Sequence, residues 1–204
     1  MLACLDLEGV LVPEIWIAFA DKTGIKELRL TTRDIPDYDK LMRGRLKILD
    51  EHKLKLSDIQ AVIRTISPLE GAGEFLNWLR SEFQVIILSD TFYEFAGPLM
   101  AQLGYPTLFC NYLESDNTGR IVNYRLRQKD GKTKAVQALK SLDFKAIAAG
   151  DSYNDTGMLK AADAGIFFCP PENIIKEFPQ FKVTHTYEQL RAEFIAARTK
   201  ILKS

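Results

Sequence analysis

The chain has 204 residues, of which 47% are hydrophobic and 26% are charged, so it can form one full-size domain with an insertion and has ordinary globular composition. Its 27 basic and 27 acidic residues cancel, which argues against a nucleic-acid or membrane-surface role. No apolar run reaches the ~20 residues of a transmembrane helix, the start lacks a basic leader, and three distant cysteines form no disulfide framework, so we expect a cytoplasmic protein.

The first predicted strand covers residues 2–7, and no convincing strand follows until residue 68. This stretch instead predicts three helices, over residues 15–23 after Pro13, over 38–51, and from Ser57 as a cap to 66. We therefore expect a helical cap domain at residues 13–68, inserted after the first strand of an α/β core made of residues 1–12 plus 69–204.

The rest of the chain alternates apolar runs with amphipathic segments. Helices are predicted over residues 71–81, 92–103, 132–142 and 154–162. Strands are predicted over residues 83–88, 144–149 and 164–168, with a weaker one over 107–110. Turn residues Asp116 to Gly119, flanked by 112–114 and 121–126, predict a small β-hairpin. Continuous apolar strands between helices favour an α/β fold, a doubly wound three-layer parallel sheet.

Polar residues gather where these elements meet. Asp6 and Glu8 end the first strand, Ser89-Asp90-Thr91 follows the second, Lys132 begins a helix, and Gly150-Asp151-Ser152-Tyr153-Asn154-Asp155 follows a later strand. The carboxyl ends of parallel strands form one edge of a sheet, where ligands bind. Carboxylates, a hydroxyl and a lysine are the groups that phosphoryl transfer uses, and oxygen ligands suit Mg²⁺.

These four motifs, in this order, resemble those of the haloacid dehalogenase superfamily of phosphotransferases, over the whole chain. Within it the chain is similar to phosphoserine phosphatases, and the stretches AxCLDLEGVLVPEIW and AAGDSYND resemble the bacterial ones that also transfer the phosphoryl group from phosphoserine to homoserine. The resemblance implies a haloacid dehalogenase-like fold and Mg²⁺ as cofactor.

Roles for the motif residues follow from that resemblance. Asp6 would be the nucleophile. The metal ligands would be Asp6, Asp151 and the backbone carbonyl of Glu8. The Glu8 side chain would be the general acid and base. Ser89, with backbone near Asp90 and Thr91, would hold the phosphate. Lys132 would pair with the phosphoryl group, and it is preferred to Lys134 because apolar residues follow it at helical spacing. Asp155 would support the metal ligands, and Asn154 would reach the substrate.

The resemblance also implies that two cap residues bind the substrate's ammonium and carboxylate groups, at positions held here by Glu14 and Arg45. Arginine suits bidentate carboxylate recognition, and Arg43 is the competing choice. Helical charges are more often simply solvated.

Two positions depart from the family pattern. The second acid of the first motif is usually aspartate, and here it is Glu8, which we hypothesise favours a hydroxyl acceptor over water. Asp90 stands where these phosphatases usually carry glycine, and the sequence gives no account of its added charge near the phosphate.

We therefore expect a Mg²⁺-dependent phosphoserine phosphatase that also transfers the phosphoryl group from phosphoserine to homoserine. We expect no nucleic-acid or membrane partner. A homodimer is compatible with the sequence, which leaves the oligomeric state open. The alternatives are a phosphatase for another small phosphomonoester, a non-catalytic phosphoacceptor, which the insertion disfavours, and a dehalogenase, which the metal-binding acids disfavour.

Overall fold

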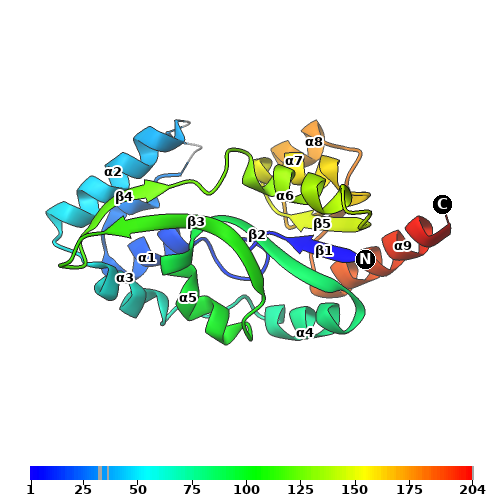
Figure 1. The fold of residues 1–204 in the computed structure, drawn as a ribbon, viewed down its shortest axis with the longest axis horizontal. Coiled ribbons are helices and arrows are strands. Elements are labelled where there is room, and N and C mark those ends of the chain that lie inside the picture. The colour runs from blue at the N-terminus through cyan, green and yellow to red at the C-terminus, as the bar shows by residue number, and fades with distance from the viewer. Residues whose placement is uncertain (32–33, 36, 204) are drawn as a thin grey trace.

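The computed structural model describes residues 1–31, 34–35 and 37–203 of the chain. Within these residues seven strands form one sheet in the order β4-β3-β2-β1-β5-β6-β7 (Figure 1). The pairs are parallel except for β3 with β4. The strands are β1 Leu2–Leu5, β2 Gln84–Phe92, β3 Thr107–Ser115, β4 Ile121–Arg125, β5 Ala146–Gly150, β6 Ala164–Phe168 and β7 Lys182–Thr184. The predicted α/β class is confirmed.

Helices cover both faces of the sheet, as its apolar strands require. One face packs against α4 Ala72–Glu82, α5 Tyr93–Gln102 and α9 Tyr187–Lys203, and the other against α6 Gly131–Lys140, α7 Thr156–Ala161 and α8 Glu172–Glu177 (Figure 1). Strand β1 lies between β2 and β5 and is buried along its whole length. Successive side chains of a strand point to opposite faces, so Ala3 and Leu5 join one apolar cluster and Leu2 and Cys4 the other. The predicted three layers are thus confirmed.

The insertion after β1 is helical, as the sequence predicts. It contains α1 Ile15–Thr23, the 3₁₀ turn η1 Lys26–Arg29, α2 Tyr38–Glu51 and α3 Leu56–Ile63. Helix α2 begins at a capping Asp37, whose carboxylate accepts a hydrogen bond from the Lys40 amide at 3.1 Å. The predicted cap of α3 at Ser57 is wrong, because Ser57 lies inside the helix. There the Asp58 carboxylate accepts from the Lys55 amide at 2.9 Å.

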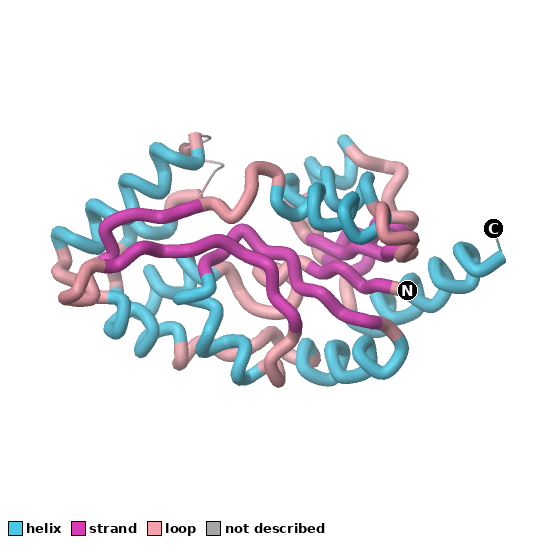
Figure 2. Tube along the Cα trace, in the orientation of Figure 1, coloured by secondary structure: helices cyan, strands magenta, loops and turns pink. Residues whose placement is uncertain are grey.

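The hairpin is larger than predicted and reaches the insertion. Strand β3 is continuous where two separate strands were expected, and it carries β4 out beside α2 (Figure 2). The Arg120 guanidinium donates two hydrogen bonds to the Asp50 carboxylate, at 2.5 and 2.8 Å, and the Tyr124 hydroxyl donates to Asp39 at 2.7 Å. A two-stranded extension needs apolar cover to be stable, and α2 supplies it. The division into residues 13–68 and the remainder stays a prediction.

Strand β2 ends later than predicted. It continues through Phe92, with a register shift against β3 between Leu88 and Phe92. Such irregularities bend a strand and re-aim its side chains, and they are common beside active sites. Among the described residues, no helix is both long and apolar enough to span a bilayer.

Candidate active site

The pairing of three neighbouring strands brings the motif residues to one edge of the sheet. Leu5, the last residue of β1, lies opposite Ile87 of β2 and Ala149 of β5. The Asp6 amide donates to the Ala149 carbonyl at 2.9 Å. Asp6, Ser89 and Asp151, which follow those strand positions, therefore meet at the carboxyl end of the sheet, as the sequence predicts.

Lys132 is the centre of a buried charge network. Its Nζ lies 2.8 Å from the Asp6 carboxylate, 2.8 Å from that of Asp155 and 3.6 Å from that of Asp90. Burial lowers the pKa of Lys132, but these carboxylates raise it by more, so the pKa stays well above its ordinary value and the ammonium is charged. Lys134, the competing candidate, is exposed.

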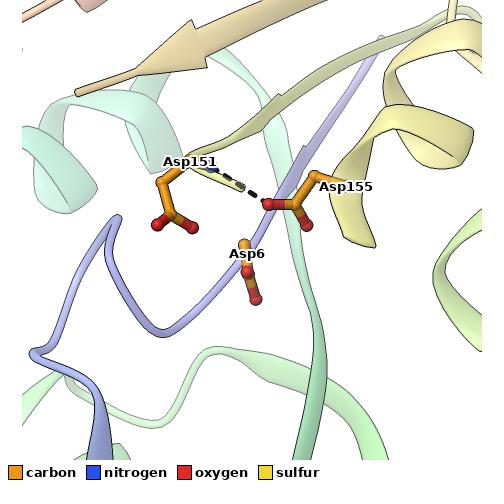
Figure 3. A group of neighbouring side chains, drawn as sticks. All are labelled: Asp6, Asp151 and Asp155. Carbon is orange, nitrogen blue, oxygen red and sulfur yellow. Dashed lines mark hydrogen bonds between the residues drawn. The ribbon is translucent and has the colours of Figure 1, made fainter. Parts of the chain in front are cut away.

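The Asp155 carboxylate holds the segment after β5 in a tight turn. Its Oδ2 accepts a hydrogen bond from the Asp151 amide at 3.0 Å (Figure 3). The same oxygen accepts from the Ser152 amide at 3.1 Å, and Oδ1 faces Lys132. Gly150 makes this approach possible, because a Cβ there would lie 2.3 Å from the Asp155 carboxyl carbon. These bonds hold residues 153–155 in a 3₁₀ turn, so the helix predicted from 154 begins only at Thr156.

The three aspartates form a cluster suited to a cation. One carboxylate oxygen each of Asp6, Asp151 and Asp155 lies within 4.8 Å of the others (Figure 3). Burial, and then repulsion from Asp155, raise the pKa of Asp151 to about 7. Both oxygens of Asp155 are bonded, to Lys132 and to backbone amides, and so are both oxygens of Asp6, to Lys132 and the Leu7 amide. Hard oxygen donors with excess negative charge fit a divalent cation.

The first motif closes over this cluster. Gly9 adopts a positive φ of +75°, and a Cβ on it would lie 2.4 Å from the Asp151 carboxyl carbon. A side chain at residue 9 would therefore occupy space used by the cluster, and the backbone conformation also favours glycine. The loop between Asp6 and α1 thus depends on glycine at this position.

Glu8 lies between this loop and the insertion. Its Oε2 accepts a hydrogen bond from the Ile15 amide, at the start of α1, at 3.3 Å. Burial, and then the neighbouring Glu14 carboxylate, raise the pKa of Glu8 to about 8. Glu14 is exposed and directly precedes α1, so the two predicted acids lie close together.

The bulged end of β2 presents Ser89, Asp90 and Thr91. The Ser89 hydroxyl accepts from the Thr91 amide at 3.2 Å, and both residues are buried. The Asp90 carboxylate accepts from the Asn154 side-chain amide at 2.8 Å as well as facing Lys132. Asp90, unexplained by the sequence, therefore connects β2 to the turn after β5.

Sequence reasoning missed Asn111, which holds this loop from β3. Its side-chain amide donates to the Asp90 carbonyl at 3.0 Å, and its oxygen accepts from the Arg127 amide at 3.0 Å. The signal in the sequence was a polar residue next to an apolar strand segment. Asn111 is buried, and a buried polar side chain is tolerated when it is hydrogen-bonded.

Arg45 projects from α2 and is 8% exposed. Its Nη2 donates to the Leu30 carbonyl at 2.7 Å, and its guanidinium lies 4.5 Å from the centre of the Trp16 ring. Its buried Nε–H makes no hydrogen bond within the described residues. Arg43 instead bonds Asp39 at 2.9 Å on the exposed side of the helix. The geometry favours Arg45 over Arg43 as the inward-facing arginine.

Comparison with known proteins agrees with this arrangement. Residues 1–163 match the family model of haloacid dehalogenase-like hydrolases. The chain is 67% identical over 201 residues to phosphoserine phosphatase ThrH of Pseudomonas aeruginosa, covering 98% of each chain. It is also 67% identical over 201 residues to a phosphoserine phosphatase of Pseudomonas syringae pv. tomato, covering 98% of this chain and 85% of that one.

Among solved structures, a substrate-bound phosphoserine phosphatase complex superposes with a TM-score of 0.73 at 19% identity, covering 95% of this chain and 97% of that one. An apo phosphoserine phosphatase gives 0.72 at 23% identity, covering 89% and 91%. At such identities these two show the fold alone. From the family match and the 67% identities, the chain belongs to the haloacid dehalogenase-like hydrolases and, within them, to the phosphoserine phosphatase family. The family resemblance read from the motifs is confirmed.

Proposed function

We propose that this chain hydrolyses phosphoserine and also transfers the phosphoryl group to homoserine, through an aspartyl phosphate on Asp6. The observation that carries the proposal is the Asp6 carboxylate, held by the Leu7 amide at 2.7 Å and by Lys132 at 2.8 Å beside two further aspartates. The 67% identity to two phosphoserine phosphatases supports the substrate.

The chemistry proceeds in two displacements. In the first, an Asp6 oxygen attacks phosphorus, the bond from phosphorus to the serine oxygen breaks, and Glu8 gives that oxygen a proton. In the second, Glu8 takes a proton from water or from the homoserine hydroxyl, whose oxygen attacks phosphorus as the bond to Asp6 breaks. The products are free Asp6 and either phosphate or phosphohomoserine.

The charged groups around Asp6 stabilise this reaction electrostatically. Lys132 would face the phosphoryl oxygens, and Ser89 with the backbone of Asp90 and Thr91 would hold them. Mg²⁺, held by Asp6, Asp151 and the Glu8 carbonyl, would neutralise charge on the phosphoryl group. The Asp151 and Ser152 amides donate to the Asp155 carboxylate, which fixes their backbone. Asn154 would turn from Asp90 toward the substrate.

Substrate selection would come from the insertion. The inward guanidinium of Arg45 suits the phosphoserine carboxylate, and Glu14 suits the ammonium group. Glu8 interacts electrostatically with both Arg45 and Glu14, so the groups proposed for substrate recognition and for proton transfer would act close together.

The longer acid at position 8 bears on the choice of acceptor. Glu8 is one methylene longer than the usual aspartate and would sit differently over an attacking water. A Glu8→Asp variant should therefore raise the ratio of phosphate to phosphohomoserine. An unchanged ratio would rule this role out.

The direct test is to incubate the chain with phosphoserine and Mg²⁺, with and without homoserine, and measure phosphate and phosphohomoserine. Phosphohomoserine formed at the expense of phosphate supports both activities, and phosphate alone supports hydrolysis only. If neither product forms, the substrate is another small phosphomonoester. If a stable phospho-Asp6 forms without turnover, the chain is a phosphoacceptor. We also propose a cytoplasmic location, tested by cell fractionation, and a homodimer, tested by solution scattering.

A further inference from the structure

Tyr38 is the first residue of α2 and shares a face of that helix with Arg45. The two are seven residues apart, which is close to two helical turns. Arg45 leans back toward the start of the helix, because its Nη1 lies 3.7 Å from the Met42 sulfur. The guanidinium thus lies over the turn next to Tyr38.

The Tyr38 ring is held while its hydroxyl is unused. The ring packs edge-on against Tyr124 of β4, with centroids 5.8 Å apart and planes at 81°. The hydroxyl makes no hydrogen bond within the part of the chain that the structure describes. Burial, and then the charge of Asp90, raise the Tyr38 pKa well above its usual range, so the phenol keeps its proton and is a donor.

Ring contacts place Tyr38 between the insertion and the end of β2, because its ring packs on Tyr124, which in turn packs on Phe92 with ring centroids 6.3 Å apart. The charges of Asp90, Arg45 and Glu8 all act on the phenol. An unused O–H donor next to a guanidinium whose buried Nε–H is also unused offers two donors to one ligand. A carboxylate accepts up to about four hydrogen bonds and carries the charge that the guanidinium requires.

We infer that the Tyr38 hydroxyl donates a hydrogen bond to the α-carboxylate of the amino-acid substrate, beside Arg45, and so contributes to specificity. This inference rests on the proposed function. Homoserine has one more methylene than serine between its hydroxyl and its α-carbon. A second donor one turn from the Arg45 guanidinium can hold the carboxylate of either amino acid.

The test compares two substrates in one variant. Tyr38→Phe removes the donor and keeps the ring, and phosphoethanolamine has the ammonium and phosphate of phosphoserine without the carboxylate. The ratio of kcat/KM for phosphoserine to that for phosphoethanolamine should fall about tenfold, since a hydrogen bond to a charged group is lost. A partly folded preparation lowers both rate constants equally, so the ratio is insensitive to it.

Tyr124→Phe is the matched control. It removes a hydroxyl from the adjoining ring, where that hydroxyl bonds Asp39 on the outer side of α2, and it should leave the ratio unchanged. An unchanged ratio in Tyr38→Phe, or an equal fall in both variants, overturns the inference. If the wild-type chain shows no preference for phosphoserine over phosphoethanolamine, the proposed function is wrong. That result is seen without any variant, and it also excludes the contact between Tyr38 and the carboxylate.

Discussion

The catalytic edge of the sheet and the inward face of α2 differ in how far the chain satisfies its own polar groups. At the sheet edge, Lys132 meets three carboxylates, and both oxygens of Asp155 are bonded. On α2, the buried Arg45 Nε–H has no partner among the described residues. A buried polar group left unpaired costs free energy, so a ligand that pairs with it gains affinity. The polar groups of the sheet edge are paired with one another, while the inward face of α2 keeps one buried donor unpaired among the described residues.

The largest effect is expected from Asp6, the proposed nucleophile. Asp6→Asn keeps the shape and an acceptor for the Leu7 amide but removes the attacking charge. Phosphate release from phosphoserine should fall by about four orders of magnitude or more. The free energy of unfolding should not fall, because burial already disfavours the charge of Asp6. Activity within tenfold of the wild type would exclude Asp6 as the nucleophile.

Lys132→Met probes the satisfied network itself. The change leaves the buried carboxylates of Asp6 and Asp155 facing each other without a cation. The free energy of unfolding in metal-free buffer should fall by about 3–5 kcal/mol, measured by urea denaturation. Turnover should fall about a hundredfold or more. A variant as stable as the wild type would contradict the role given to this ion network.

Arg45→Met should separate binding from stability. It deletes an unpaired buried donor, and the Leu30 carbonyl that it releases belongs to a partly exposed residue. The unfolding free energy should change by less than about 1 kcal/mol, whereas kcat/KM for phosphoserine should fall about a hundredfold. Arg43→Met, on the exposed side of α2, is the control and should alter neither. A large loss of stability in Arg45→Met would remove the contrast between the two regions.

The smallest effect is expected at Asp90, which joins the end of β2 to Asn154 and Lys132. Asp90→Asn removes a charge near the bound phosphate and keeps a group that can bond Asn154. Because the Asp90 side chain is 48% exposed, screening limits the gain, and KM for phosphoserine should fall about two- to fivefold. A higher KM in steady-state kinetics would show that the Asp90 charge positions Lys132 or Asn154 for binding.

The sequence predicted the sheet edge better than the α2 face. Apolar runs located β1, β2, β5 and β6, and acids at their ends placed Asp6 and Asp151 together, because strand ends in a parallel sheet converge. The hairpin was underestimated because the cover that stabilises its extension comes from α2, about 70 positions away in the chain. The bulge at Ser89 was missed for the same reason, since Asn111 of β3 holds it from 21 positions away. The turn at Asp155 was missed although its hydrogen bonds to the Asp151 and Ser152 amides are local.

The sequence by itself determined the order of most elements and the family, and it singled out Asp6 as the proposed nucleophile, because periodicity and motif spacing are properties of short segments. Only the tertiary structure decided that Asp90 bridges Lys132 and Asn154, that Arg45 rather than Arg43 turns inward, and that the Tyr38 ring packs against Tyr124. Whether a side chain is buried and paired depends on which segments, distant in the chain, pack together. An arginine on a helix can therefore be a solvated charge or a buried group, depending on what packs against it.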